Sequence, residues 1–267
     1  MNIQQIRNAT LVVEYAGKKF LIDPFLGEKG AYPPFPDSPR QERNNPLVDL
    51  PTSIDNIVHN VDAVVVTHLH LDHWDDAAKE TLPKDIKLFA QNAEDAAEIR
   101  NSGFQNVEVL QEDTVFEGVH LSKTQGEHGR GEILKVAGVV CGIVFNHSDE
   151  KTLYVAGDTV WNDYVKQEIE THKPEVIVVN AGDNQFLKGG SLVMGKDDVY
   201  EVHKVATDAK IIASHMEAVN HWTLSREELK TSSMKKESPQ TSWFRTTENH
   251  TLLTVKAERK DNFSFCF

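Results

Sequence analysis

Three features that would place the protein in a common class are scarce in the sequence. Two cysteines in 267 residues cannot form a disulfide framework, and they favour a reduced, cytoplasmic location. No stretch approaches the roughly 18 apolar residues of a membrane span, and the N-terminus lacks the apolar core of a signal peptide. Basic residues number 28 against 41 acidic ones, and this formal net charge of -13 argues against a nucleic-acid surface. We therefore expect a cytoplasmic protein whose partner is a small molecule, with neither nucleic acid nor membrane involved. A homo-oligomer is compatible with these features.

The apolar content is sufficient for a core. With 39% hydrophobic residues, the chain can build one α/β domain or two small ones. Its character changes near residue 230, since residues 231–250 include eight Ser or Thr. We divide the chain into a domain at 1–230 and a divergent tail at 231–267. Within the tail, Leu252–Val255 is a candidate edge strand of the same domain.

The most informative stretch is a β-branched run followed directly by four potential metal ligands. Residues Val61–Thr67 are too few for a typical helix and indicate a buried strand of the parallel type. The chain continues with His68, His70, Asp72 and His73, so three of the 12 histidines fall in one six-residue window. If the chain stays extended, the first two imidazoles point to the same side. Imidazole and carboxylate together suit zinc, manganese or iron. One cation cannot easily take all four side chains from a tight turn, which suggests two neighbouring ions.

This HLHLDH segment resembles the HxHxDH signature of the metallo-β-lactamase superfamily. Within that superfamily, the chain looks most similar to the branch of metal-dependent hydrolases that includes ascorbate-phosphate lactonase. The resemblance extends over roughly residues 3–230. It implies an α/β fold of four layers, an αββα sandwich. Two mixed β-sheets would face each other between outer helices, with the metal ions at one edge.

The resemblance also implies ligand roles for three residues far along the chain. His128 lies among three glycines on a loop, where the family has its third ligand histidine. Asp158 follows a glycine at the end of an apolar strand, the usual place for a site residue in an open α/β layer, and matches the family's metal-bridging aspartate. His215 ends the expected strand Lys210–Ser214 and matches the final ligand better than His221 does.

The roles of the assembled side chains follow from the same resemblance. One ion would take His68, His70 and His128, the other would take Asp72, His73 and His215, and Asp158 would bridge them. We expect two divalent ions, most simply Zn²⁺, although Mn²⁺ or iron also suits the ligands. A hydroxide shared by two such ions can attack a small ester, lactone or phosphoester. Asp72 would also orient that water.

Several other residues are candidates for supporting roles. His221 either contacts the substrate or transfers a proton to the leaving group, or it is a structural histidine. Asp23 either ends a strand or supports a ligand histidine, as an aspartate here does in the resembled family. Residues 26–56 hold five prolines between Pro33 and Pro46, which predicts a long loop. The loop either covers the substrate, with Tyr32 and Phe35 as wall residues, or is a plain surface excursion.

Two other classes of function fit the same ligand pattern. Histidine and carboxylate ligands also suit a di-iron redox or oxygen-reactive centre, although no flavin-binding partner domain is visible in the sequence. A non-hydrolytic metal-binding protein is the third reading. The complete ligand set favours a hydrolase over this third reading. Catalytic metals keep positions open for water, which fits the expected division of the ligands between two ions.

Overall fold

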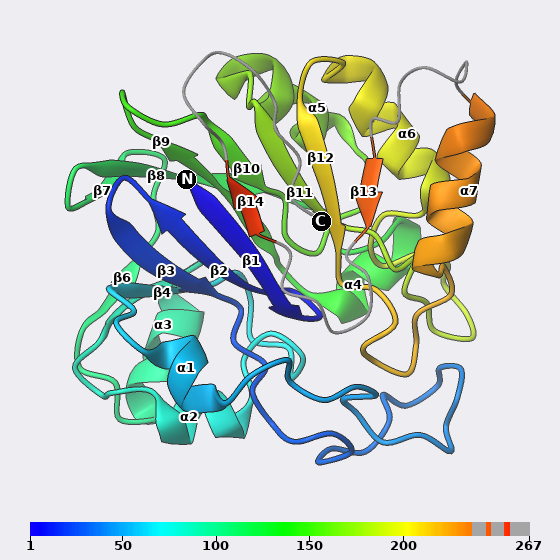
Figure 1. Ribbon diagram of the computed structural model, residues 1–267. Coiled ribbons are helices and arrows are strands. Elements are labelled where there is room, and N and C mark those ends of the chain that lie inside the picture. The colour runs from blue at the N-terminus through cyan, green and yellow to red at the C-terminus, as the bar shows by residue number, and fades with distance from the viewer. Residues whose placement is uncertain (237–243, 247–253, 257–267) are drawn as a thin grey trace.

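The computed structural model describes residues 1–236, 244–246 and 254–256, and it contains two mixed β-sheets that face each other (Figure 1). In order across the first sheet, the strands are β14 (Thr254–Lys256), β1 (Asn2–Arg7), β2 (Thr10–Tyr15), β3 (Lys18–Ile22), β4 (Ala63–Val66), β5 (Lys87–Ala90) and β6 (Val107–Val109). The second sheet contains, in order, β13 (Phe244–Thr246), β12 (Lys210–Ser214), β11 (Val176–Asn180), β10 (Leu153–Val155), β9 (Cys141–Asn146), β8 (Val119–Gln125) and β7 (Thr114–Phe116).

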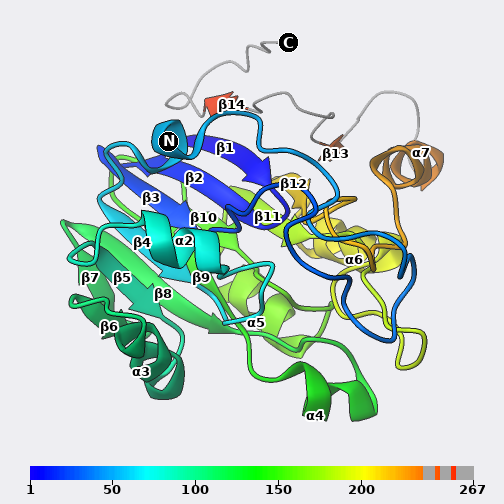
Figure 2. The same ribbon diagram turned by 90° about the horizontal axis from the view of Figure 1, so that it is seen from below.

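Helices cover the outer face of each sheet, as Figures 1 and 2 show from two directions. On the first sheet lie α1 (Ile54–Val58), α2 (Asp76–Thr81) and α3 (Ala93–Asn101). On the second lie α5 (Asp163–His172), α6 (Lys196–Val205) and α7 (Arg226–Lys236). A short 3₁₀ turn, η1 (Gly131–Ile133), leads into α4 (Leu134–Ala137). The four-layer αββα sandwich predicted from the sequence is confirmed.

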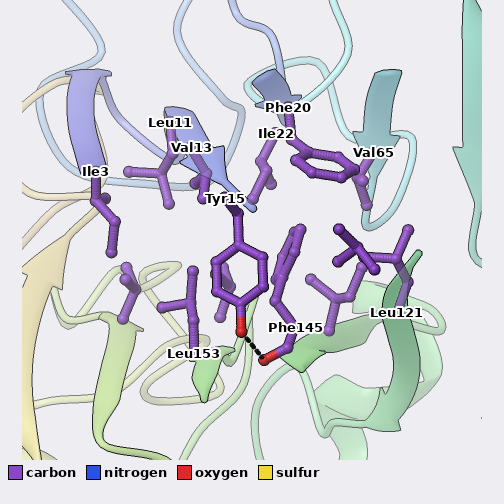
Figure 3. Packing of buried hydrophobic residues seen from close by; sticks show 14 of the residues in the cluster. Ile3, Leu11, Val13, Tyr15, Phe20, Ile22, Val65, Leu121, Phe145 and Leu153 are labelled. Atoms are coloured by element: carbon purple, nitrogen blue, oxygen red, sulfur yellow. Dashed lines mark hydrogen bonds between the residues drawn. The ribbon is translucent and has the colours of Figure 1, made fainter. Parts of the chain in front are cut away.

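Side-chain alternation along the strands explains the layers. Val65 of β4 points into the cluster between the sheets, whereas its neighbours Val64 and Val66 pack against the outer helices. Because both faces of β4 are covered, every position in it is apolar and buried. Between the sheets, Tyr15 and Phe145 pack with ring centroids 5.6 Å apart (Figure 3).

The parallel parts of the two sheets determine where a site can form. Strands β3, β4, β5 and β6 are parallel to one another, as are β10, β11, β12 and β13. Parallel strands bring their carboxyl ends to one edge of the sheet, and loops after several strands can meet there. Asp23, Thr67 and His215 directly follow β3, β4 and β12, so they lie at that edge.

Two expectations differ from the observed elements. The apolar pattern of Val115–Thr124 predicts one strand, but the structure has the β7–β8 hairpin there, and its two turn residues, Glu117 and Gly118, both have positive φ. The loop expected over residues 26–56 ends in α1, because Ser53 accepts a hydrogen bond from the amide of Asn56 and caps the helix. Neither change displaces a candidate ligand.

The C-terminal segment contributes to both sheets. Strand β14 pairs antiparallel with β1, and β13 pairs parallel with β12. Of the predicted edge strand, Leu252 and Leu253 lie outside the described residues, and the division of the chain at residue 230 stays a prediction. In the described part of the chain, no helix has both the length and the apolar character to cross a bilayer.

Candidate metal centre

The HLHLDH segment turns sharply as it leaves β4. The amides of His73 and Trp74 both donate to the carbonyl of His70, each at 2.9 Å, which folds the segment back. The rings of His68 and His70 then lie 4.4 Å apart and nearly perpendicular. Directly after the turn, the carboxylate of Asp75 accepts from the amide of Ala78 and caps α2. The helix therefore begins immediately after the ligands and anchors the turn.

Distant segments bring three more candidate ligands to the same point. His128 comes from the loop after β8, Asp158 from the loop after β10, and His215 from the end of β12. Their ligand atoms form compact groups with those of the turn, with all atoms of a group within 4.8 Å of one another. The three groups are His68, His70 and His128; His68, His73 and Asp158; and Asp72, His73 and His215. All seven predicted metal ligands therefore meet at one place.

Asp158 occupies the centre of the cluster. Its Oδ2 lies 3.2 Å from the Nε2 of His73, 3.6 Å from those of His128 and His215, and 3.9 Å from that of His68. Two of these imidazoles, those of His68 and His128, belong to one expected ion site, and those of His73 and His215 belong to the other. This position fits a carboxylate shared by two cations. The preceding Gly157 has a φ of +70°, and a Cβ there would collide with the carbonyl of Cys141.

His128 is oriented by the backbone of another loop. Its Nδ1 lies 3.0 Å from the carbonyl oxygen of Leu192, to which an Nδ1–H can donate. That hydrogen bond leaves Nε2 directed at the cluster, 3.3 Å from the Nδ1 of His70. Fixing one imidazole nitrogen in this way leaves the other free to ligate a metal.

His73 is oriented by a buried aspartate. Asp23 accepts hydrogen bonds from the amide of Thr67 at 2.7 Å and from its hydroxyl at 2.8 Å. Its Oδ2 also lies 2.9 Å from the Nδ1 of His73. The carboxylate therefore links the end of β3 to the end of β4 and holds His73 with Nε2 toward Asp158. Of the two roles considered for Asp23, the contacts match support of a ligand histidine.

Asn8 joins the two sheets at the site, and no pattern in the sequence marks it. Its Nδ2 donates to Asp72 Oδ2 at 3.0 Å and lies 3.1 Å from the Nε2 of His215, while its carbonyl accepts from the amide of His215. Both Asn8 and His215 have positive φ, at 53° and 57°. Strained backbone of this kind persists where surrounding contacts over-determine it, typically at functional sites.

Asn180 supports Asp158 from the end of β11. Its Nδ2 donates to Asp158 Oδ1 at 2.6 Å, and its Oδ1 accepts from the hydroxyl of Ser214 at 2.7 Å. The hydrogen bond uses one carboxylate oxygen and leaves Oδ2 facing the imidazoles. A polar residue closing an apolar strand is the sequence signal that could have identified Asn180, because such ends line the site edge.

The charged side chains of the cluster shift one another's pKa values in opposite directions. Burial alone would raise the pKa of Asp158, but the nearby His215 and His73 hold it well below its usual range. Burial lowers the pKa of His73, yet Asp158 and Asp23 raise it well above the usual value. Burial and the neighbouring His128 instead lower the pKa of His70 to about 4. The cluster therefore combines ionised carboxylates with imidazoles that differ in proton affinity.

These residues fit metal ions on chemical grounds. The buried Nε2 of His68 makes no hydrogen bond within the described residues, and a buried nitrogen of this kind calls for a partner. Imidazole and carboxylate donors are those that zinc, manganese and iron prefer in proteins. The arrangement would hold His68, His70 and His128 on one ion, Asp72, His73 and His215 on a second, and Asp158 between them.

A small cavity of about 120 Å³ opens beside the cluster. Its metal-facing side has His70, Asp72, His128 and Asp158, and its other walls are Phe35, Leu71, Val136, Ala137, Phe186, Leu192 and His221. Phe35 thus lines the cavity, as expected of a covering loop. Tyr32 does not: its hydroxyl lies 3.2 Å from Asp75 Oδ2 and its ring stacks on Phe25. The expectation for Tyr32 was wrong because the loop turns its ring toward α2.

His221 is packed between two aromatic rings. The Phe35 ring meets it edge-on at 4.7 Å, and the Phe186 ring stacks on it at 6.2 Å. Its Nε2 lies 3.2 Å from the side-chain nitrogen of Asn184. Burial lowers the pKa of His221 to about 4, so the ring is neutral at pH 7. A neutral ring can donate a hydrogen bond through one nitrogen, but it is not an imidazolium acid.

Comparisons with known proteins complete this description. A family model described as the β-lactamase superfamily domain matches residues 18–216. The UPF0173 protein YddR of Bacillus subtilis (strain 168) is 68% identical over 237 residues, covering 88% of this chain and 93% of that protein. A UPF0173 metal-dependent hydrolase of Koribacter versatilis is 28% identical over 195 residues, covering 69% and 73%. The crystal structure of isothiocyanate hydrolase from Delia radicum gut bacteria has a TM-score of 0.90 and 41% identity, covering 96% of this chain and 99% of that one.

Proposed function

This chain belongs to the metallo-β-lactamase superfamily and, within it, to the UPF0173 family of metal-dependent hydrolases, and we propose that it hydrolyses a small uncharged electrophile such as an isothiocyanate. Family membership supports hydrolysis with metal ions. It leaves the di-iron redox centre and the non-hydrolytic metal-binding protein without support. The substrate class is the part that the proposal adds.

The cavity lining carries the proposal. Beyond the metal-ligating side chains, its walls are aliphatic and aromatic except for His221, and no Lys or Arg is among the described residues that line it. A phosphoester or carboxylate would bring negative charge that only the bound ions could neutralise, because the described lining offers no Arg or Lys beside them. A neutral substrate with a small apolar substituent fits these walls. Compared with the ester, lactone or phosphoester expected from the sequence, the proposal drops the phosphoester and adds isothiocyanates to the uncharged substrates.

The similarity to an isothiocyanate hydrolase suggests which neutral electrophile to test first. The two chains share 41% identity over nearly their full lengths. An isothiocyanate is uncharged, linear and electrophilic at its central carbon, so it matches a narrow apolar cavity with the metal cluster on one side. None of the relatives reported above is described as a lactonase, so the resemblance to ascorbate-phosphate lactonase stays a prediction.

When bound, two divalent ions lower the pKa of water toward ~7 and polarise an electrophile. The oxygen of water bonds to the central carbon, and one water proton passes by way of Asp72 to the nitrogen, forming a thiocarbamate. As the carbon–nitrogen bond breaks, the second water proton moves from the newly bonded oxygen to the nitrogen, giving an amine and carbonyl sulfide. Asp72 lines the cavity; burial would raise its pKa, but hydrogen bonding from His215 keeps the pKa below the usual range, so the carboxylate is ionised and can accept a proton.

His221 contributes a hydrogen bond in this scheme rather than a full proton. Its ring lies on the apolar side of the cavity and stays neutral at pH 7. A neutral N–H can stabilise electron density that builds up on the nitrogen or sulfur of the substrate. The two phenylalanine rings that hold it restrict its rotation.

A substrate panel tests the proposal directly. Protein loaded with Zn²⁺ should consume an alkyl isothiocyanate and release one amine per molecule, and should leave bis(4-nitrophenyl) phosphate intact. Elemental analysis should find two ions per chain; Mn²⁺ or iron in their place would revise the metal alone. His70→Ala should lower kcat/KM by about 10³-fold or more with its circular dichroism unchanged. The matched control is His120→Ala, since His120 is exposed on β8 and lines no part of the cavity.

Two results would overturn parts of the proposal. Cleavage of the phosphodiester but no isothiocyanate, ester or lactone would show that the apolar walls do not select neutral substrates. Turnover of an ester or lactone without any isothiocyanate would keep the neutral class and reject its proposed member.

A further inference from the structure

We infer that Asn220 is a positioning residue that sets the shape of the apolar cavity wall. It does so by binding the long loop between β3 and α1, which carries Phe35 and which we call the covering loop. Asn220 is fully buried, immediately precedes His221, and does not line the cavity itself. It would therefore act on the substrate only through the residues that it holds. The inference rests on the proposed function, because it concerns which neutral substrates that cavity accepts.

The side chain of Asn220 uses its full hydrogen-bonding capacity on one loop. Its Oδ1 accepts from the amide of Phe35 and from the side chain of Asn45, both at 2.9 Å. Its Nδ2 donates to the hydroxyl of Ser38 at 2.8 Å and to the carbonyl of Pro39 at 2.7 Å. An amide has two donor hydrogens and an oxygen with two lone pairs, so all four positions are filled. No other natural side chain of this size offers the same set.

The backbone of Asn220 adds to this connection. Its amide donates to Asn45 Oδ1 at 2.7 Å, so the two asparagines bind each other reciprocally. Its carbonyl accepts from the guanidinium of Arg40 at 3.2 Å, and that same guanidinium donates to the carbonyl of Trp222 and lies over its ring. Five residues between Phe35 and Asn45 of the covering loop therefore contact residues 220–222, namely Phe35, Ser38, Pro39, Arg40 and Asn45.

Two backbone hydrogen bonds connect the same loop to other segments. The amide of Leu187 donates to the carbonyl of Asp37 at 2.7 Å, and that of Leu47 donates to the carbonyl of Ala218 at 2.8 Å. In Figure 2 the loop after β3 (blue) extends across to the segments near α6, in agreement with these contacts. These bonds remain in any variant of Asn220, so losing its side chain should loosen the loop locally without detaching it.

Asn220 affects the cavity through the contact between the rings of Phe35 and His221. Phe35 is held by its own amide to Asn220, and His221 is the next residue in the chain. The 4.7 Å edge-on contact between their rings therefore depends on a link that runs through Asn220. Displacement of a positioning group by about 1 Å can cost ~10²-fold in rate. We expect Asn220 to restrict the cavity to slender substituents and to hold such substrates against the metal cluster.

Asn220→Ala tests this with two readouts. Amide hydrogen exchange in residues 35–41 should become at least about tenfold faster, because the Phe35 amide loses its acceptor. The kcat/KM for methyl isothiocyanate should fall mainly through a higher KM. The ratio of kcat/KM for benzyl over methyl isothiocyanate should rise at least about fivefold, since the wall no longer excludes bulk. Asn220→Asp, which keeps the acceptor oxygen Oδ1 and replaces the donor Nδ2 by a second oxygen, is the second variant should alanine not fold.

A double mutant separates positioning from general destabilisation. In a Phe35→Ala background the wall is already gone, so adding Asn220→Ala should leave the substrate ratio unchanged. Tyr15→Phe is the matched control, because it removes hydrogen bonds in the core between the sheets and should change stability but not the ratio. Equal losses for both substrates in Asn220→Ala, or unchanged exchange of residues 35–41, would overturn the inference. Absence of isothiocyanate turnover in the wild-type protein would instead reject the proposed function, and the exchange measurement would still decide the role of Asn220 in the loop.

Discussion

The two ends of the β-sandwich are built on opposite principles. At the β2–β3 turn, the hydroxyl of Tyr15 shares its one proton between the carbonyls of Phe145 and Lys151, at 3.1 and 2.9 Å. The surrounding core is apolar, and Figure 3 shows the contact with Phe145. At the other end, seven ionisable side chains converge. One end satisfies its few polar groups and contributes stability. The other gathers buried charge, which is costly for stability and useful for binding cations.

Replacing Asp158, the carboxylate expected to be shared by the two ions, should cause the largest loss of activity of any change at either end of the sandwich. Asp158→Ala removes the one side chain that lies near four of the imidazoles, so kcat/KM should fall by about 10³-fold or more and fewer ions should remain bound. Asp62→Ala is the control, because Asp62 is an exposed aspartate at the other end of β4. Near-normal activity and metal content in Asp158→Ala would show that Asp158 does not bridge two ions.

Weakening the support of one ligand should have an intermediate effect. Asp23→Asn keeps the shape of the side chain and removes the charge that faces His73 Nδ1. We expect metal affinity to fall about 10–100-fold, as is typical when the partner of a ligating histidine is lost. Competition with a chromophoric chelator measures this affinity. Unchanged affinity would mean that packing alone orients His73.

The smallest effect on activity is expected at the opposite end. Tyr15→Phe should destabilise the protein by about 1–2 kcal/mol, because two carbonyls lose a hydrogen-bond donor. Urea denaturation gives this value, and kcat/KM should change less than about twofold. A large loss of activity would show that the apolar end and the metal-binding end are energetically coupled, which would contradict the separation of roles described above.

Local patterns predicted much of the fold because alternation and strand length reflect burial directly. The β-branched run before His68 is β4, and the paired apolar runs at β9 and β10 are an antiparallel pair. The prediction failed over Val115–Thr124, where two strands are joined by Glu117 and Gly118. A turn of two residues leaves little interruption in the apolar pattern, so the hairpin looked like one strand.

Prediction of the site depended on how close its residues are in the chain. His68, His70, Asp72 and His73 are neighbours in sequence, so their clustering was visible without a structure. The convergence of His128, Asp158 and His215 was inferred from a family resemblance, and their positions at one point are consistent with it. Their individual catalytic and ligand roles stay predictions until metal-bound protein is measured. Asn8 gave no signal, because a turn asparagine is common and its partners lie 64 and 207 residues away.

The sequence by itself determined which chemistry is available. A histidine and aspartate turn placed after a buried strand commits the chain to a metal site at a sheet edge, because side-chain type and alternation are local properties. Only the tertiary structure decided how that chemistry is used. The walls of the cavity, the neutral state of His221 and the binding of the covering loop by Asn220 arise from contacts between segments far apart in the chain. Burial and packing create them, and neither is a property of any one segment.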